Sequence, residues 1–203
     1  MKLANDLFAV LGAPCCAGCG RAGGALCDAC RGRVPRCGSR APASGVRVVA
    51  PWEYDDAARA LVLALKRRGR RACAGPLGDA VAAEARRAGV AATVLTWVPG
   101  GRDGVAARGF DHAREIALVA GRALGLPVAG LLERCGPRPR QAGLPAGARR
   151  VNPAGAFRAR PCAGVVGLVD DVVTTGATAA ACARALRAAG AARVEVLAAC
   201  RAS

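Results

Sequence analysis

Short apolar runs alternate with amphipathic or alanine-rich stretches along most of the chain. The apolar runs predict strands over residues 46–50, 93–98 and 165–169, and a closing strand is expected over 193–199. Helical spacing and end signals predict helices over residues 57–66, 77–88, 111–124 and 177–189. Because strands and helices alternate, we expect an α/β fold with a parallel sheet flanked by helices and right-handed crossovers.

The uncharged run at 165–169 is followed by two acids and by a loop of threonine and glycine that opens a helix. The candidate ligand-binding residues are Asp170, Asp171, Val172, Val173, Thr174, Thr175, Gly176, Ala177 and Thr178. Open α/β sheets bind ligands at the carboxyl ends of their strands, and the unpaired N–H groups of a helix N-terminus favour an anion there. Gly176 lets the backbone come close, and the threonine hydroxyls add donors. This pattern predicts a site for a phosphate monoester.

The paired acids, Asp170 and Asp171, repel a phosphate and therefore have another task. They can accept hydrogen bonds from the vicinal hydroxyls of a ribose or hold a hydrated Mg²⁺. An ordinary strand-to-helix turn, in which Asp171 and Thr174 only cap the helix, explains part of the pattern. The whole pattern favours a ribose 5-phosphate site.

Four cysteines near the N-terminus have the spacing of a zinc site. Cys16-x2-Cys19 and Cys27-x2-Cys30 place four thiolates on two tight turns, which suits tetrahedral Zn²⁺. Cys15 or Cys37 could replace one ligand. Since this segment has few apolar residues, metal binding would supply its folding energy; the alternative is a disordered cysteine-rich leader.

A stretch with proline, glycine and serine at residues 38–45 predicts a linker. The expected domains are therefore a zinc-binding module with its linker over residues 1–45 and an α/β domain over residues 46–203.

The chain of 203 residues has a formal net charge of +16, which favours polyanions such as nucleic acids or small polyphosphates. Arginine supplies nearly all of this positive charge. No apolar run reaches the length of a membrane span, and residues 1–14 lack the features of a signal peptide. These patterns predict a cytoplasmic protein.

Over residues 165–178, where a strand is followed by two aspartates and a threonine-rich loop, the chain resembles the type I phosphoribosyltransferases. The matching signature of that family binds phosphoribosyl pyrophosphate (PRPP). Further motifs along nearly the whole chain narrow the resemblance to the ComF family, competence-associated proteins with a zinc finger and a phosphoribosyltransferase domain. These motifs are Leu65-Lys66-x-x-Gly69, Val98-Pro99 with Arg102, Ala107-Arg108-Gly109-Phe110, Gln141 with Leu144, Arg149 with Asn152, and Gly155-Ala156-Phe157. The family continues Arg-Gly-Phe with Asn-Gln, whereas this chain has Asp111-His112, and later family cysteines that would pair with Cys37 are missing, which suggests one zinc ion.

The resemblance implies a type I phosphoribosyltransferase-like sheet with a small N-terminal zinc ribbon, PRPP or a ribose 5-phosphate ligand with Mg²⁺, and structural Zn²⁺. It also implies pyrophosphate contacts, for which the candidates are Pro99, Arg102, Arg108 and Lys66. The implied role is DNA uptake or the use of imported DNA, with single-stranded DNA and a DNA-uptake helicase or another competence protein as partners. Three functions stay open: phosphoribosyl transfer to an unidentified nucleophile, non-catalytic nucleotide or single-stranded-DNA handling, and docking with a vestigial nucleotide site.

His112, the only histidine, begins a predicted helix, where an imidazolium is unfavourable against the helix dipole. We therefore expect a neutral or exposed side chain without a catalytic role. Five further cysteines lack ligand spacing, and buried packing is expected for them: Cys73, Cys135, Cys162, Cys182 and Cys200.

Overall fold

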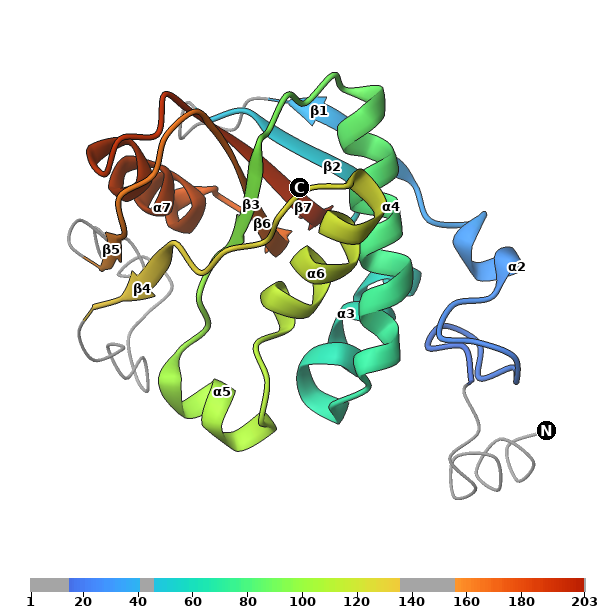
Figure 1. The fold of residues 1–203 in the computed structure, drawn as a ribbon. Coiled ribbons are helices and arrows are strands. Elements are labelled where there is room, and N and C mark those ends of the chain that lie inside the picture. The colour runs from blue at the N-terminus through green and yellow to red at the C-terminus, as the bar shows by residue number, and fades with distance from the viewer. Residues whose placement is uncertain (1–14, 41–45, 136–155, 203) are drawn as a thin grey trace.

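The computed structural model describes residues 15–40, 46–135 and 156–202 (Figure 1). A five-stranded sheet forms the centre, and helices cover both of its faces. Helices α4 and α6 lie on one face with α3, and α7 lies on the other. No helix in these ranges is both long and apolar enough to cross a membrane.

The sheet is parallel except at one edge, and its strand order is β1-β2-β7-β6-β3. Its strands are β1 (Arg36–Arg40), β2 (Val48–Glu53), β3 (Val94–Trp97), β6 (Val165–Val173) and β7 (Arg193–Arg201). Strand β1 runs antiparallel to β2, whereas β6 pairs in parallel with β7 on one side and β3 on the other. Strands β4 (Leu132–Arg134) and β5 (Phe157–Ala159) form a separate antiparallel ribbon. Strand β6 is therefore an interior strand, with its carboxyl end between those of two parallel neighbours.

Two of the helices, α3 and α6, begin at aspartate caps and end at glycines in the left-handed conformation. The helices are α2 (Asp28–Arg31), α3 (Asp56–Arg68), η1 (Arg71–Cys73), α4 (Ala74–Arg87), α5 (Arg102–Arg108), α6 (His112–Leu124) and α7 (Ala177–Ala188). The Asp55 side chain accepts a hydrogen bond from the N–H of Ala58 at the start of α3, and Gly69 ends that helix with a φ of 65°. Asp111 caps α6 in the same way.

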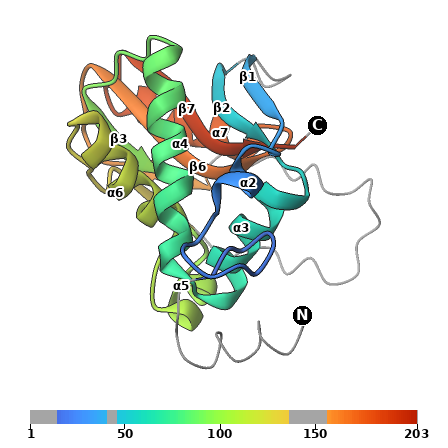
Figure 2. The same cartoon turned by 90° about the vertical axis from the view of Figure 1, so that its right-hand side faces the viewer.

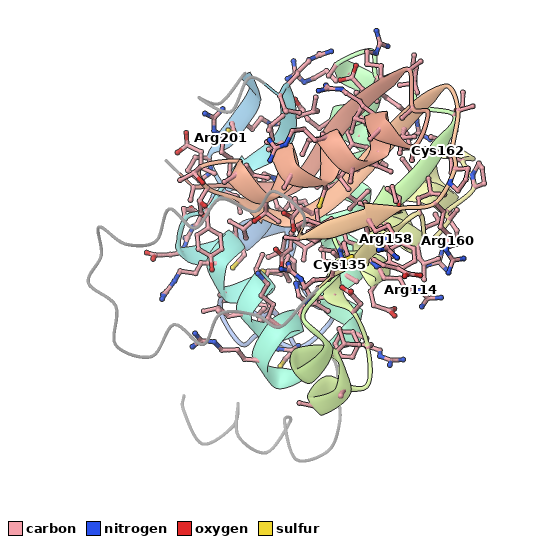
Figure 3. The ribbon with its side chains drawn as sticks, turned by 90° about the vertical axis from the view of Figure 1, so that its left-hand side faces the viewer. Arg114, Cys135, Arg158, Arg160, Cys162 and Arg201 are labelled. Atoms are coloured by element: carbon pink, nitrogen blue, oxygen red, sulfur yellow. The ribbon has the colours of Figure 1, made fainter. Side chains whose placement is uncertain are left out.

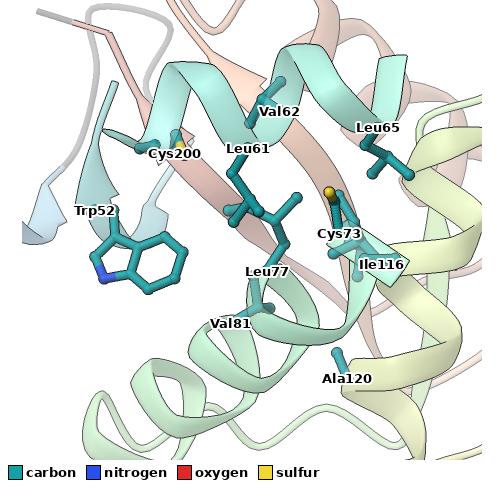
Figure 4. Close-up of a cluster of buried hydrophobic side chains, with 14 of the residues drawn as sticks. Trp52, Leu61, Val62, Leu65, Cys73, Leu77, Val81, Ile116, Ala120 and Cys200 are labelled. Atoms are coloured by element: carbon teal, nitrogen blue, oxygen red, sulfur yellow. The ribbon is translucent and has the colours of Figure 1, made fainter. Parts of the chain in front are cut away.

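The core consists of two hydrophobic layers, one on each face of the sheet. Leu61, Leu77 and Ile116, from α3, α4 and α6, are fully buried in the layer shown in Figure 4. Burying one such side chain contributes about 1.5–3 kcal/mol. Helices α4 and α6 pack closely at Gly78, which has no side chain. A Cβ atom there would lie only 2.5 Å from the Cβ of Val119.

The N-terminal cysteine segment packs against the main body beside α3 (Figure 2). Cys16, Leu26, Cys30 and Val34 belong to the same hydrophobic layer as α3 and α4. The guanidinium of Arg70 donates a hydrogen bond to the carbonyl of Cys15. Between α2, β2 and α4 lies a groove of about 860 Å³. This segment thus shares its core with the α/β fold; the boundary at residue 45 remains a prediction.

The structure confirms a mixed α/β fold with a mostly parallel sheet, and it corrects two expectations. Residues 38–40 were expected in a linker, but they belong to β1, and Ser39 pairs with Val49. Backbone hydrogen bonds at a sheet edge form with residues of any side chain, so composition does not reveal such a strand. Strand β6 continues to Val173, so the two acids lie within it and not after it. Residues 41–45 of the expected linker lie outside the described ranges.

Candidate functional site

The carboxyl end of β6 and the start of α7 enclose a small hollow of about 50 Å³. Its lining residues are Asp170, Val172, Val173, Thr174, Thr175, Gly176, Thr178 and Ala179. All three threonines are exposed. The structure therefore brings most of the loop residues predicted from the sequence around one space, which suits a group no larger than a phosphate.

The first turn of α7 is open to an anion. Gly176 is its N-cap with a φ of 75°, so no N-cap side chain covers the helix end, and the first turn contains no acid. The N–H of Ala177 donates a long hydrogen bond, 3.4 Å, to the hydroxyl of Thr175, and among the described residues neither Asp171 nor Thr174 bonds to the helix. Asp171 and Thr174 therefore do not cap α7, and further N–H groups of its first turn and the dipole could meet a ligand.

Asp170 and Asp171 meet opposite surroundings. Asp170 lines the hollow beside α7. The Asp171 side chain is only 4% exposed, and its Oδ2 lies 2.5 Å from Nζ of Lys66 and 2.9 Å from Nε2 of His112. Since successive side chains of a strand point to opposite faces, only one of two neighbouring acids can face the hollow.

These surroundings separate the acidities of the two carboxyls. Burial and the charge of Asp171 raise the pKa of Asp170 well above its ordinary value. Burial also acts to raise the pKa of Asp171, but the hydrogen bond from His112 and the charge of Lys66 outweigh it and lower the pKa to about 2. Asp171 is therefore the stably ionised member of the pair.

The structure describes only some of the side chains that were expected to contact a pyrophosphate. The N–H of Gly100 is already taken by Oδ2 of Asp111 at 2.8 Å, and the carbonyl of Pro99 accepts from Nε of Arg134 at 3.4 Å. Lys66 is paired with Asp171, although 32% of its side chain is exposed. Arg102 and Arg108 lie in α5, and their side chains are outside the described part, as are the motif residues Gln141, Leu144, Arg149, Asn152 and Gly155.

Sequence reasoning missed the contact of His112 with Asp171 and that of Arg134 with the Pro99 loop. His112 was expected to be neutral or exposed, yet its side chain is only 15% exposed and lies against a carboxylate. Both contacts join segments far apart in the chain, so no local pattern predicts them. The one signal was the Asp111-His112 pair, which differs from the expected Asn-Gln.

The four cysteines with zinc spacing form a compact cluster. The sulfur atoms of Cys16, Cys19, Cys27 and Cys30 all lie within 4.8 Å of one another. Sulfurs on a tetrahedral Zn²⁺ with bonds of about 2.3 Å are roughly 3.8 Å apart, close to the 3.7 Å between Cys19 and Cys27. A Cβ atom on Gly18 would lie 3.0 Å from the Cys30 sulfur, so this turn favours glycine.

The cluster also has the chemistry of a metal site. Burial acts to raise the pKa of the Cys16 thiol, but hydrogen bonds from backbone N–H groups, first that of Cys27, lower it to about 6. Burial and the neighbouring cysteines raise the pKa of Cys30 to about 12. A cation among the four sulfurs would relieve this repulsion and stabilise the thiolates. The cluster could therefore bind zinc, while Cys15 is not part of it and Cys37 lies in β1.

No protein-family model matches this chain, and no curated protein is similar to it in sequence. A solved structure titled "Structure of the allosteric regulatory enzyme of purine biosynthesis" is similar to it with 22% identity and a TM-score of 0.42. The match covers 63% of this chain and 26% of that chain, so it spans about a quarter of the length of that enzyme.

Proposed function

We propose that this chain is a phosphoribosyltransferase-like protein of the ComF type, which binds PRPP or another ribose 5-phosphate ligand with Mg²⁺ at the β6–α7 loop. One observation carries the proposal: Asp170 and the threonine loop share a hollow with the open N-terminus of α7. The hollow lies at the carboxyl end of an interior parallel strand, where α/β sheets bind their ligands.

The chemistry of the loop matches a sugar phosphate. The N–H groups of the first turn of α7 and the hydroxyls of Thr174, Thr175 and Thr178 would hold the phosphate. The Asp170 carboxylate would accept hydrogen bonds from the vicinal hydroxyls of the ribose. The hydroxyls and N–H groups of the protein would thereby meet the acceptors of the phosphate, and the Asp170 carboxyl would meet the hydroxyl donors of the ribose.

The pyrophosphate of PRPP would extend from the ribose toward the loop that follows β3. Strand β3 pairs in parallel with β6, and Trp97 lies opposite Val169, so both loops leave the same edge of the sheet. Pro99, Arg102, Arg108 and Lys66 are the proposed contacts. Mg²⁺ would neutralise the pyrophosphate oxygens. In a transfer reaction, the bond from ribose C1 to pyrophosphate breaks, pyrophosphate leaves with the electron pair, and a nucleophile bonds to C1.

A second candidate function is the handling of single-stranded DNA without catalysis, in support of DNA uptake or the use of imported DNA. The net charge of +16 favours it. Figure 3 shows Arg158 of β5, Arg160 just after that strand and Arg114 of α6 on the face that it presents, and all three are exposed. The N-terminal segment that carries Cys16, Cys19, Cys27 and Cys30, here called the cysteine module, would then bind zinc and dock on a DNA-uptake helicase or another competence protein.

Calorimetric titration of ribose 5-phosphate and of Mg²⁺ with PRPP separates these functions. The wild type should bind both, and Asp170→Asn should weaken binding by roughly threefold to tenfold, because asparagine offers one acceptor oxygen where the carboxyl offers two, and a hydrogen bond contributes about 0.5–1.5 kcal/mol. Asp79→Asn, the same change at an exposed site on α4, is the matched control and should bind normally. A wild type that binds neither ligand, but binds single-stranded DNA with steep salt dependence, would contradict the first function.

A further inference from the structure

Two consecutive residues at the start of α6 each contact a different segment of the candidate site. Asp111 accepts hydrogen bonds from the N–H of Ala113, at 3.1 Å, and from the N–H of Gly100, at 2.8 Å. It therefore caps α6 and ties down the loop that follows β3. His112 places Nε2 at 2.9 Å from Asp171 Oδ2 and so joins α6 to the carboxyl end of β6.

The contact with β6 is buried and shared with a third element. Lys66 of α3 approaches the same oxygen of Asp171, so one carboxylate joins α3, α6 and β6. A hydrogen bond to a buried charged group is stronger than a neutral one at the surface. Helix α6 is itself firmly held, because Ile116 is fully buried and Gly78 of α4 lies against Val119.

We propose that Asp111 and His112 are positioning residues of the ribose-phosphate site. Asp111 fixes the loop that would meet the pyrophosphate, and His112 together with Lys66 fixes Asp171 and with it the end of β6. Asp170 is then the acid that meets the ribose. This inference rests on the proposed function for the identity of the ligand. The holding of the β3 loop and of the end of β6 by Asp111 and His112 applies to the ligand-free protein as well.

The geometry separates this role from acid–base catalysis. Nε2 of His112 is engaged by Asp171, and Nδ1 is buried with no hydrogen-bond partner among the described residues. Asp171 faces α3 and α6, whereas the hollow lies on the α7 side of β6. Neither ring nitrogen of His112 therefore reaches a ligand in the hollow, and its effect must pass through β6.

A glutamine at residue 112 offers an N–H donor to Asp171, as does the imidazole. This equivalence supplies a conservative variant, His112→Gln, to set against His112→Leu, which keeps bulk but has no donor.

Hydrogen exchange of the ligand-free protein tests the positioning role. In His112→Leu the backbone amides of residues 170–173 should exchange at least roughly tenfold faster than in the wild type, because the end of β6 loses its tie. His112→Gln should exchange at the wild-type rate. Equal rates in the wild type and His112→Leu, or equal acceleration in both variants, would overturn the proposal. If His112→Leu does not fold, as judged by circular dichroism, Lys66→Met replaces it and carries the same expectation.

Titration of ribose 5-phosphate separates this inference from the proposed function. His112→Leu should bind roughly tenfold more weakly than the wild type, and His112→Gln within about threefold of it. If the wild type binds and His112→Leu binds equally well, the positioning role is wrong although the function stands. If the wild type binds no ribose 5-phosphate, the proposed function fails, and hydrogen exchange alone decides the positioning role.

Discussion

Asp170 and Asp171 are neighbours in the chain but differ in what holds them. The side chain of Asp171 is nearly covered and meets a lysine and a histidine from two helices. Asp170 has no such partner among the described residues and lines the hollow. A carboxyl that burial and a like charge make hard to ionise is one that gains from a ligand with hydroxyl donors.

The first prediction concerns the acid stability of the folded chain. Because the folded-state pKa of Asp171 is about 2 and its ordinary value is 3.8, its stabilisation is complete above 3.8 and is lost as the pH falls toward 2. Asp171→Asn should remove this pH dependence. It should also lower the free energy of unfolding at neutral pH by about 2 kcal/mol, less than for a fully buried pair because Lys66 is 32% exposed. Urea unfolding over a pH series measures both, and an unchanged slope between these pH values would contradict the assignment.

At the scale of elements, apolar runs predicted the four parallel strands and the helices α3, α4, α6 and α7, since burial of a strand or a helix face leaves a periodic pattern. Strand β1 and the β4–β5 ribbon left no such pattern. They are short, and backbone pairing with a distant segment defines them. The loop residues of the site could be predicted from the sequence because they are contiguous. The partners of Asp171 come from α3 and α6, far away in the chain, so no local pattern could predict them.

The second prediction tests the packing of α4 against α6, which sets the position of His112. Gly78→Ala should lower the free energy of unfolding by about 1–3 kcal/mol, because its Cβ would lie 2.5 Å from that of Val119. Gly75→Ala, in the same helix with no neighbour within 4 Å of the added atom, should stabilise by up to about 1 kcal/mol. Thermal unfolding of the two variants gives the comparison, and equal effects would exclude close packing as the cause.

At the scale of the whole molecule, the cysteine module is built into the fold. It contributes to the hydrophobic layer of α3 and α4, and β1 extends the central sheet immediately after it. Arg70 joins it to the turn after α3, the helix that carries Lys66. Loss of metal from the cysteines should therefore lower the stability of the whole fold and not only of the module.

The third prediction follows from this connection. The purified protein should contain about one zinc ion per chain, and a strong chelator should lower its melting temperature. Cys19→Ser should abolish zinc binding, whereas Cys135→Ser, the same change outside the cluster, should retain it. Elemental analysis and calorimetry measure both effects. A chelated protein with an unchanged melting temperature would show that the four thiols need no metal.

The two tryptophans of the chain lie in different parts of the fold. Trp52 is 6% exposed and lines the groove between the cysteine module and α4. Trp97 ends β3, next to β6, with the guanidinium of Arg114 at 5.8 Å from its ring. Indole emission shifts to longer wavelength as water reaches the ring. The Trp97→Phe variant therefore reports optically on the cysteine module, and Trp52→Phe reports on the packing of α6 against β3, without any added label.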